Sequence, residues 1–341
     1  MMVAVRRTRP LAIAALAILV LAVIWYKWEL RPVDADDQVG MAVQIPSGSS
    51  VRSIAAILTD KHLVRSRLTF TLYARIHRVQ GEMKAGGFFL RPSMSTPEII
   101  TVLRRGFSEA SVVTIPEGYT VKDIDRLLSE RGLTKPGEVL TCARTCDVSS
   151  FAFLPSAAGW ATRAGKAEGY LFPDTYFVVQ EQMTAQSFLE RMLGNFRTRV
   201  VKGLADDLKA SKRSLTDIVT MASLIEEETR TDEERPLVAG ILWKRFDRTI
   251  GLQVDAAVRY ILEKPKGSIT QEDLQLNSPY NLRKYRGLPP GPIANPGLAS
   301  IKAALHPKDN PYYYYLHGTD GAIHYAVTND EHNENRRKYL R

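Results

Sequence analysis

The sequence predicts an α+β protein with an N-terminal transmembrane helix, a small α+β unit, and a larger α+β domain that ends in a β-hairpin. Three observations lead to this class. A strand end, a Pro/Gly turn and an amphipathic helix occur in this order twice, an apolar helical period runs into three consecutive glutamates, and two β-rich runs flank a tight turn near the C-terminus. The 341 residues, 45% of them hydrophobic, suffice for two or three domains with substantial cores.

The N-terminal segment is long enough to cross a bilayer. Residues 10–26 carry no charge and are dominated by Leu, Ala, Ile and Val. Basic residues precede this stretch and aromatic residues close it: Arg6, Arg7, Arg9, Trp25, Tyr26 and Trp28. This asymmetry predicts cytoplasmic residues 1–9, a transmembrane helix at 10–28 in the inner membrane, and an extracytoplasmic remainder. An alternative is a signal peptide cleaved near Val33-Asp34-Ala35.

Charge and cysteine content narrow the function classes. The net charge of +9 includes the three N-terminal arginines, and both signs are interleaved along the chain. No basic run alternates with aromatic residues, so we expect no nucleic-acid partner. Cys142 and Cys146, the only cysteines, could form a small disulfide loop in an exported domain. Two thiols without a second Cys or His pair do not indicate zinc, and no phosphate-binding loop appears, so we expect neither metal nor cofactor.

A repeated pattern organises the first half of the chain. Residues 45–54 and 115–124 share Ile-Pro-x-Gly-x-x-Val-basic-x-Ile, and each copy predicts a strand end, a tight turn and a helix. The first copy, within residues 40–110, continues to a helix at 68–78, a strand at 86–90 and a helix at 96–105. This succession resembles the LysM family of glycan-binding modules, although a spacer between membrane and catalytic domain would explain it equally well. The second copy lies in residues 111–213 and continues to a helix at 185–200.

The character of the chain changes in residues 214–341. Helices are predicted at 215–228, 233–246, 256–262 and 300–305, with a short strand at 252–255. Asp255 stands where it could cap the helix that follows it. Runs 312–316 and 323–327 flank Thr319-Asp320-Gly321, which is a good hairpin signal.

The glutamates at 226–228 are the strongest chemical signal. At about 100° per residue, Glu228 lies on the same helical face as Met221, Leu224 and Ile225, whereas Glu227 points away and Glu226 lies at the margin. A carboxyl group against apolar side chains has a raised pKa and can act as a general acid near neutral pH. The alternative is a solvated helix end, with Glu228 paired to Arg230 or Arg235.

Downstream polar residues suit a carbohydrate substrate. Gln253, Tyr280 and Asn281 are candidates to line a sugar-binding cleft, with loop hydrogen bonding as the alternative. Asp255 is a candidate second acid, or a capping or positioning group. His306, Asn329 and His332 are weaker candidates.

Five motifs occur in order behind the predicted anchor. They are Glu168-Gly169-Tyr170-Leu171-Phe172-Pro173-Asp174-Thr175-Tyr176, Met221-Ala222-Ser223-Leu224-Ile225-Glu226-Glu227-Glu228-Thr229, Leu252-Gln253-Val254-Asp255, Ser278-Pro279-Tyr280-Asn281 and Gly287-Leu288-Pro289-Pro290-Gly291-Pro292-Ile293. Together they resemble the YceG-like endolytic murein transglycosylases, from the anchor to the C-terminus. The resemblance implies a membrane-held bacterial lytic transglycosylase, with residues 111–341 as its catalytic domain and 214–341 as the core of that domain. Its essential glutamate corresponds to Glu228, and Glu226 matches the first acid of the motif.

The resemblance also implies a reaction and partners. The enzyme would cut the β-1,4 bond between N-acetylmuramic acid and N-acetylglucosamine inside nascent peptidoglycan strands, forming 1,6-anhydro ends and limiting strand length. Peptidoglycan synthases would be neighbours in the membrane. Two alternatives remain open: a catalytically silent, glycan-binding scaffold of the wall-synthesis machinery, and a hydrolase that uses water on the same polymer.

Overall fold

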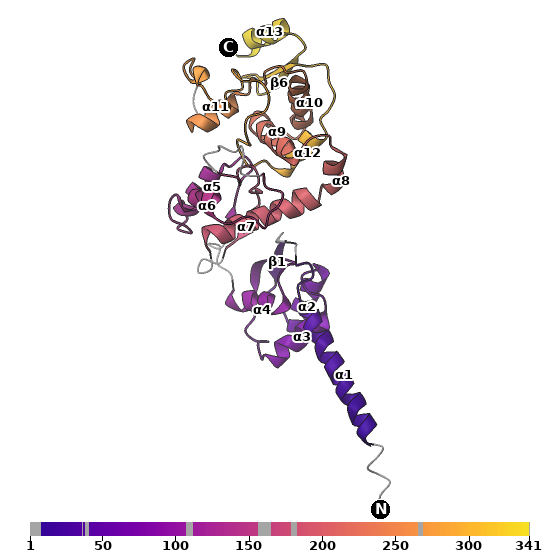
Figure 1. Ribbon diagram of the computed structural model, residues 1–341. Coiled ribbons are helices and arrows are strands. Elements are labelled where there is room, and N and C mark those ends of the chain that lie inside the picture. The colour runs from indigo at the N-terminus through magenta and orange to yellow at the C-terminus, as the bar shows by residue number, and fades with distance from the viewer. Residues whose placement is uncertain are drawn as a thin grey trace, which may run out of the picture. The chain divides into compact units, whose positions relative to one another are not determined.

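A computed structural model describes residues 8–35, 37, 41–106, 112–155, 165–178, 183–264 and 269–340 (Figure 1). Arg6 and Arg7, which the sequence places in the cytoplasm, lie outside these ranges. Contacts divide the chain into two compact units, Met1–Val112 and Val113–Arg341. Helices and two-stranded sheets occur in both units, which confirms the α+β class.

The first unit is a small sheet covered by helices. Its elements are α1 (Thr8–Glu29), β1 (Met41–Ile45), α2 (Val51–Asp60), α3 (Arg67–Ile76), β2 (Gly86–Leu90) and α4 (Thr96–Arg105). β1 and β2 pair antiparallel, with Met41 opposite Leu90. Leu58, Phe70 and Leu103 are fully buried in one hydrophobic core.

Helix α1 extends from this unit (Figure 1). Its C-terminal end is held to the unit by Arg65, whose guanidinium lies 4.6 Å from the centre of the Trp28 ring. Arg65 also donates hydrogen bonds to the carbonyl oxygens of Pro32 and Val33. A search of the described residues finds no helix with both the length and the apolar character that crossing a membrane requires.

The second unit carries the remaining elements. They are β3 (Val112–Thr114), α5 (Val121–Glu130), α6 (Glu138–Thr145), β4 (Thr175–Phe177), α7 (Ala185–Phe196), the π-helix η3 (Arg197–Lys202), α8 (Ala205–Ala210), α9 (Leu215–Glu228), α10 (Glu234–Asp247), α11 (Asp255–Leu262), the 3₁₀ helix η4 (Asp273–Gln275), α12 (Leu298–Leu305), β5 (Tyr314–His317), β6 (Ile323–Ala326) and α13 (Asn329–Tyr339). β3 pairs with β4, and β5 with β6. Helix α9 is central, because α10, α11 and α12 all contact it.

The repeated turn has the same local structure in both units. Gly48 and Gly118 adopt φ values of 77° and 79°, a left-handed conformation that glycine reaches without strain. Two residues later, Ser50 and Thr120 cap α2 and α5, each accepting a hydrogen bond from the backbone N–H three residues on. The predicted order of strand, turn and helix is therefore confirmed in both copies.

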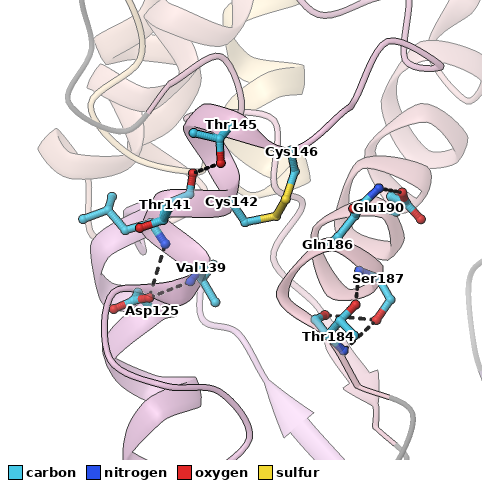
Figure 2. Close-up of a disulfide and its surroundings, with 11 residues drawn as sticks. Asp125, Val139, Thr141, Cys142, Thr145, Cys146, Thr184, Gln186, Ser187 and Glu190 are labelled. Carbon is cyan, nitrogen blue, oxygen red and sulfur yellow. Dashed lines mark hydrogen bonds between the residues drawn. A yellow bond between two sulfur atoms is a disulfide. The ribbon is translucent and has the colours of Figure 1, made fainter.

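The two cysteines form a disulfide at the end of α6 (Figure 2). Cys142 is buried among the residues of the hydrophobic core. The other end of α6 is held by Asp125 of α5, whose carboxylate accepts hydrogen bonds from the N–H groups of Gly137 at 2.8 Å and Val139 at 2.9 Å. Both ends of this short helix are thus fixed by side chains.

Two local predictions near the carboxylate helix are wrong. Residues 252–255 form no strand, because Gln253 has a φ of 58° and reverses the chain between the buried side chains of Leu252 and Val254. Asp255 does not cap α11: Val254 holds that position, and the Asp255 carboxylate is bound by Arg283 instead. The helix predicted at 185–200 is α7 continued by the π-helix η3.

Candidate active site

Helix α9 brings the glutamates to the site. Ser214 caps its first turn by accepting a hydrogen bond from Asp217 N–H at 3.0 Å, and residues 218–225 are all buried. The helix ends at Glu228, because Thr229 turns to an extended conformation with φ −127°. The acids therefore occupy the last turn, where the helix leaves the core.

Glu228 is held by a hydrogen bond from the C-terminal hairpin. The Tyr315 hydroxyl of β5 donates to Glu228 Oε2 at 2.9 Å. Burial raises the pKa of Glu228 to about 7, helped by the charges of Asp255 and Glu227, while the Tyr315 hydrogen bond and Arg259 lower it. At this pKa the carboxyl group can both give and take a proton near neutral pH, as a general acid and base must.

Asp255 and Arg283 lie beside Glu228. Arg283 Nε donates to Asp255 Oδ1 at 2.5 Å and its Nη2 to Oδ2 at 2.8 Å. The Asp255 charge raises the pKa of Glu228, and both carboxylates in turn raise the pKa of Arg283. Both oxygens of the Asp255 carboxylate are thus held by Arg283, which suits Asp255 to a positioning role.

Gln253 is linked through Arg245 to the backbone two residues before Tyr315. This arginine of α10 is buried, and it donates to Gln253 Oε1 at 2.9 Å and to the carbonyl oxygen of Tyr313 at 3.0 Å. It also donates to the carbonyl oxygen of Gly251. One guanidinium therefore connects the turn before α11 with the start of β5.

The other two glutamates of the triplet have different surroundings. Glu226 accepts a hydrogen bond from Gly297 N–H at 2.9 Å and pairs with Arg235 at 3.4 Å. Arg235, a predicted alternative partner of Glu228, instead binds Glu226, Asp232 and Ser300. Glu227 is exposed at the surface, although desolvation of its carboxylate, together with the Glu226 charge, raises its pKa to about 7.

Tyr280 and Asn281 belong to a separate part of the loop structure. Asn281 is fully buried, and its amide donates to the carbonyl oxygens of Leu274 at 2.8 Å and Leu276 at 2.9 Å. The Tyr280 ring lies 5.5 Å from that of Tyr260, and among the described residues its buried hydroxyl has no hydrogen-bond partner. Asn281 therefore shapes the loop that carries Arg283 two residues later.

Sequence reasoning missed a second buried acid, Glu168. Its carboxylate accepts hydrogen bonds from Val121 N–H at 3.0 Å, the Tyr260 hydroxyl at 3.1 Å and Asn295 Nδ2 at 3.2 Å. Burial raises its pKa to about 8 against these donors. The available signal was an acid separated by one glycine from the apolar segment Tyr170–Phe172.

The weaker candidates are dispersed. His306 pairs with Asp207 at 3.3 Å, His332 stacks on Tyr314 with ring centres 5.2 Å apart, and Asn329 begins α13. In the part of the chain that the structure describes, no group of three His, Cys, Asp or Glu side chains is arranged to hold a metal ion. Of the predicted set, the structure thus places Asp255 close enough to Glu228 for its charge to act on it, and it adds Tyr315 and Arg283; Gln253 is held by Arg245 instead.

Known proteins resemble this chain over most of its length. The model of the YceG-like family matches residues 43–338. An endolytic murein transglycosylase of Bacillus subtilis is 31% identical over 328 residues, which cover 94% of this chain and 90% of the relative. A protein of the same name from Streptococcus pneumoniae D39 is 31% identical over 332 residues, but the aligned part is only 59% of that longer protein.

A solved structure extends the likeness to the fold. The crystal structure of the yceG-like protein lmo1499 from Listeria monocytogenes superposes with a TM-score of 0.61 at 30% identity, covering 87% of this chain and 99% of that one. Sequence and fold agree over nearly the same span, and on these grounds the chain belongs to the YceG-like family.

Proposed function

We propose that this protein is an endolytic murein transglycosylase. It would cleave the β-1,4 bond between N-acetylmuramic acid and N-acetylglucosamine within nascent peptidoglycan strands, leave 1,6-anhydro ends and so limit strand length. Family membership and the names of the relatives support the activity. The observation that carries the proposal is one half-buried glutamate, Glu228, which is hydrogen-bonded to Tyr315 and whose pKa of about 7 suits it to move a proton in both directions.

The reaction needs one carboxyl group in two roles. Protonated Glu228 donates its proton to the oxygen that links the two sugars, and the bond from that oxygen to the muramic C1 breaks through an oxocarbenium-like state. The Glu228 carboxylate then takes the proton of the muramic C6 hydroxyl, whose oxygen bonds to C1 and closes the anhydro ring. The proton count balances without water, and Glu228 ends protonated for the next cycle.

A second carboxylate acting as base or nucleophile would define an ordinary glycosidase. Asp255 is the nearby candidate, but Arg283 binds both of its oxygens. We propose that Asp255 positions Arg283 and tunes Glu228, and that it does not attack the sugar. This arrangement favours the lytic reaction over hydrolysis.

The other candidate residues have different supporting roles in this proposal. Asp255, whose charge acts on Glu228, and Gln253, which lies two residues before it, contact or orient the sugar beside Glu228. Tyr280 and Asn281 act on substrate through the loop that they stiffen, and Glu226 supports the helix end through Arg235 and Gly297. No cofactor is needed for these steps.

We also propose that residues 10–28 anchor the protein in the inner membrane as a single span, with residues 1–9 in the cytoplasm and the catalytic domain outside it. The support is the charge asymmetry and an unusual set of exposed apolar side chains on α1: Leu16, Ile18, Leu19, Val20, Leu21, Val23, Ile24, Trp25 and Trp28. An anchor of this kind would hold the enzyme near peptidoglycan synthases. Residues 40–110 would be a LysM-like module that binds the glycan, and residues 111–341 the catalytic domain.

Product analysis tests the function. The full chain, purified in detergent, is incubated with uncrosslinked peptidoglycan strands, and the products are identified by mass spectrometry. We expect internal cleavage with 1,6-anhydro ends, and a loss of about 10²- to 10⁴-fold in rate for Glu228→Gln. Glu227→Gln is the matched control and should retain activity within a few-fold at pH 5.5.

Other outcomes would favour the alternatives. Reducing ends that carry added water would mean a hydrolase. Unchanged glycan with wild-type protein, together with wild-type cell-wall phenotype for Glu228→Gln in cells, would mean a scaffold.

A further inference from the structure

The contact between the C-terminal hairpin and Glu228 has a chemical consequence. We infer that Tyr315 is a positioning residue that reserves Glu228 Oε1 for the reactive proton, because its hydroxyl occupies Oε2. The inference deepens the function proposed above and rests on it. It gives the hairpin, which is distant in sequence from α9, a direct part in the acid–base cycle.

The hydrogen bond has a defined direction. The Tyr315 hydroxyl carries one hydrogen and donates it to Glu228 Oε2 at 2.9 Å. A proton on Oε2 would compete with that hydrogen and force the tyrosine to give up its donation. Within the described ranges no hydrogen bond reaches Oε1 from another side chain or from the backbone. The acidic proton is therefore best accommodated on Oε1, which is also the oxygen left for a sugar.

The position of Tyr315 is fixed from two directions. In the hairpin it lies opposite Tyr325 in the β5–β6 register. From behind, Arg245 binds the carbonyl oxygen of Tyr313 and lies 5.3 Å from the centre of the Tyr314 ring. The strand thus has little freedom to withdraw the hydroxyl from Glu228.

The same hydrogen bond serves both halves of the proposed cycle. After Glu228 has given its proton to the leaving sugar, the new carboxylate is stabilised by the Tyr315 donor, because hydrogen bonds to a charged acceptor are stronger than bonds to a neutral one. The charges that act on the pKa of Glu228 are those of Asp255 and Arg259 from α11 and of Glu227 from α9, while Arg283 is coupled to Glu228 and Arg245 acts on Tyr315. Tyr315 is the neutral donor in this set.

Removal of one hydroxyl group isolates this role. In Tyr315→Phe the carboxylate form of Glu228 loses its donor, so its pKa rises and the alkaline fall of kcat/KM moves to higher pH. We expect kcat to drop between about 10- and 100-fold, with KM changed less than threefold. The assay follows anhydro-end formation by the full chain from pH 5 to pH 9.

The matched control lies on the adjacent strand. Tyr325→Phe removes a hydroxyl from the residue opposite Tyr315, and we expect both the rate and the pH profile to stay as in the wild type. Thermal unfolding of each variant measures whether the hairpin still folds.

The possible results distinguish the role of Tyr315 from the proposed function itself. Unchanged kcat in Tyr315→Phe, or a reduced kcat with an unshifted pH profile, would overturn the positioning role. If the wild-type protein forms no anhydro ends, the proposed function itself fails. Anhydro ends from the wild type with no pH shift in the variant would refute the inference about Tyr315 alone.

Discussion

Arg283 binds both carboxylate oxygens of Asp255 at the start of α11, Nε donating to Oδ1 at 2.5 Å and Nη2 donating to Oδ2 at 2.8 Å. The pair lies close enough to Glu228 for the Asp255 charge to raise the pKa of the catalytic candidate. A neutral side chain at position 255 should therefore make Glu228 a stronger acid.

For Asp255→Asn we expect the alkaline fall of kcat/KM to move to lower pH by about half a unit or more. The reason is that the substitution removes a negative charge that disfavours the carboxylate form of Glu228. This shift is opposite in sign to the one expected for Tyr315→Phe. The pH profile of anhydro-end formation measures it.

Asp247→Asn is the matched control, since Arg213 also binds both oxygens of that carboxylate, each at 2.8 Å. It lies at the end of α10 and does not affect the pKa of Glu228, so its profile should remain that of the wild type. An upward shift or no shift in Asp255→Asn would contradict the electrostatic role.

Much of the local structure follows from the sequence. The boundaries of α9 and α4 were predicted to the residue, because each begins at a serine cap and carries an apolar stripe of helical period. The repeated Ile-Pro-x-Gly turn likewise specifies its own geometry, because the capping residue follows the glycine by only two positions. Helical phase also singled out Glu228, which is half-buried in the structure, as is Glu226, whereas Glu227 is exposed.

The surroundings of Glu228 could not be predicted in the same way. Tyr315 lies 87 positions after Glu228, and Arg245 binds groups as far apart as Gly251 and Tyr313. Periodicity describes only neighbours along one element, and it carries no information about which hairpin closes over which helix end. Alternating polarity at 252–255 indicated a strand, but such a pattern carries no information on backbone dihedral angles. It therefore could not reveal that Gln253 is left-handed.

Glu168 should make stability depend on pH. Its pKa is about 8 in the folded protein against an ordinary value of 4.5, so the unfolded chain releases this proton first as pH rises. The contribution of Glu168 to the free energy of unfolding is therefore fully present below about pH 4.5 and is lost as pH rises through 8. The loss for this group is on the order of 3 to 5 kcal/mol.

In Glu168→Gln that contribution is absent, and denaturant unfolding at pH 5 and pH 8 should show a flatter dependence than in the wild type. Gln can still accept from Val121 N–H and Asn295 Nδ2. Glu227 and Glu228 also have raised pKa values, but they are present in both proteins and cancel in the comparison. Equal slopes for the two proteins would refute the assignment.

The disulfide between Cys142 and Cys146 should contribute modestly to stability. It closes a loop of sequence separation 4, for which the loss of unfolded-state entropy corresponds to about 2 kcal/mol. The double variant Cys142→Ala/Cys146→Ala should lose about that much or less, because Asp125 still holds the other end of α6. Urea unfolding measures the loss, and cleavage activity should persist. Complete unfolding of the double variant would show that the disulfide is required for the fold and does not only hold the end of α6.

Gly169 should tolerate no side chain. It has a φ of 87°, and a Cβ atom there would come within 2.3 Å of Pro292 Cγ and 3.1 Å of Val219 Cγ1. Gly169 thus allows the segment after Glu168 to pass between Val219 of α9 and residues 287–293, which form a proline-rich loop. Gly287 is the matched control, with a φ of 95° and no atom within 4 Å of the same position.

Gly287→Ala should cost only the backbone strain, about 1 to 2 kcal/mol, whereas Gly169→Ala should add overpacking and cost about 3 kcal/mol or more. Denaturant midpoints of the two variants measure the difference. Because Val219 belongs to α9, the helix that ends at Glu228, Gly169→Ala should also lower activity more than its loss of folded protein explains. Equal destabilisation of the two variants would mean that the proline-rich loop yields to the methyl group, and that the close approach at Gly169 is not required for the fold.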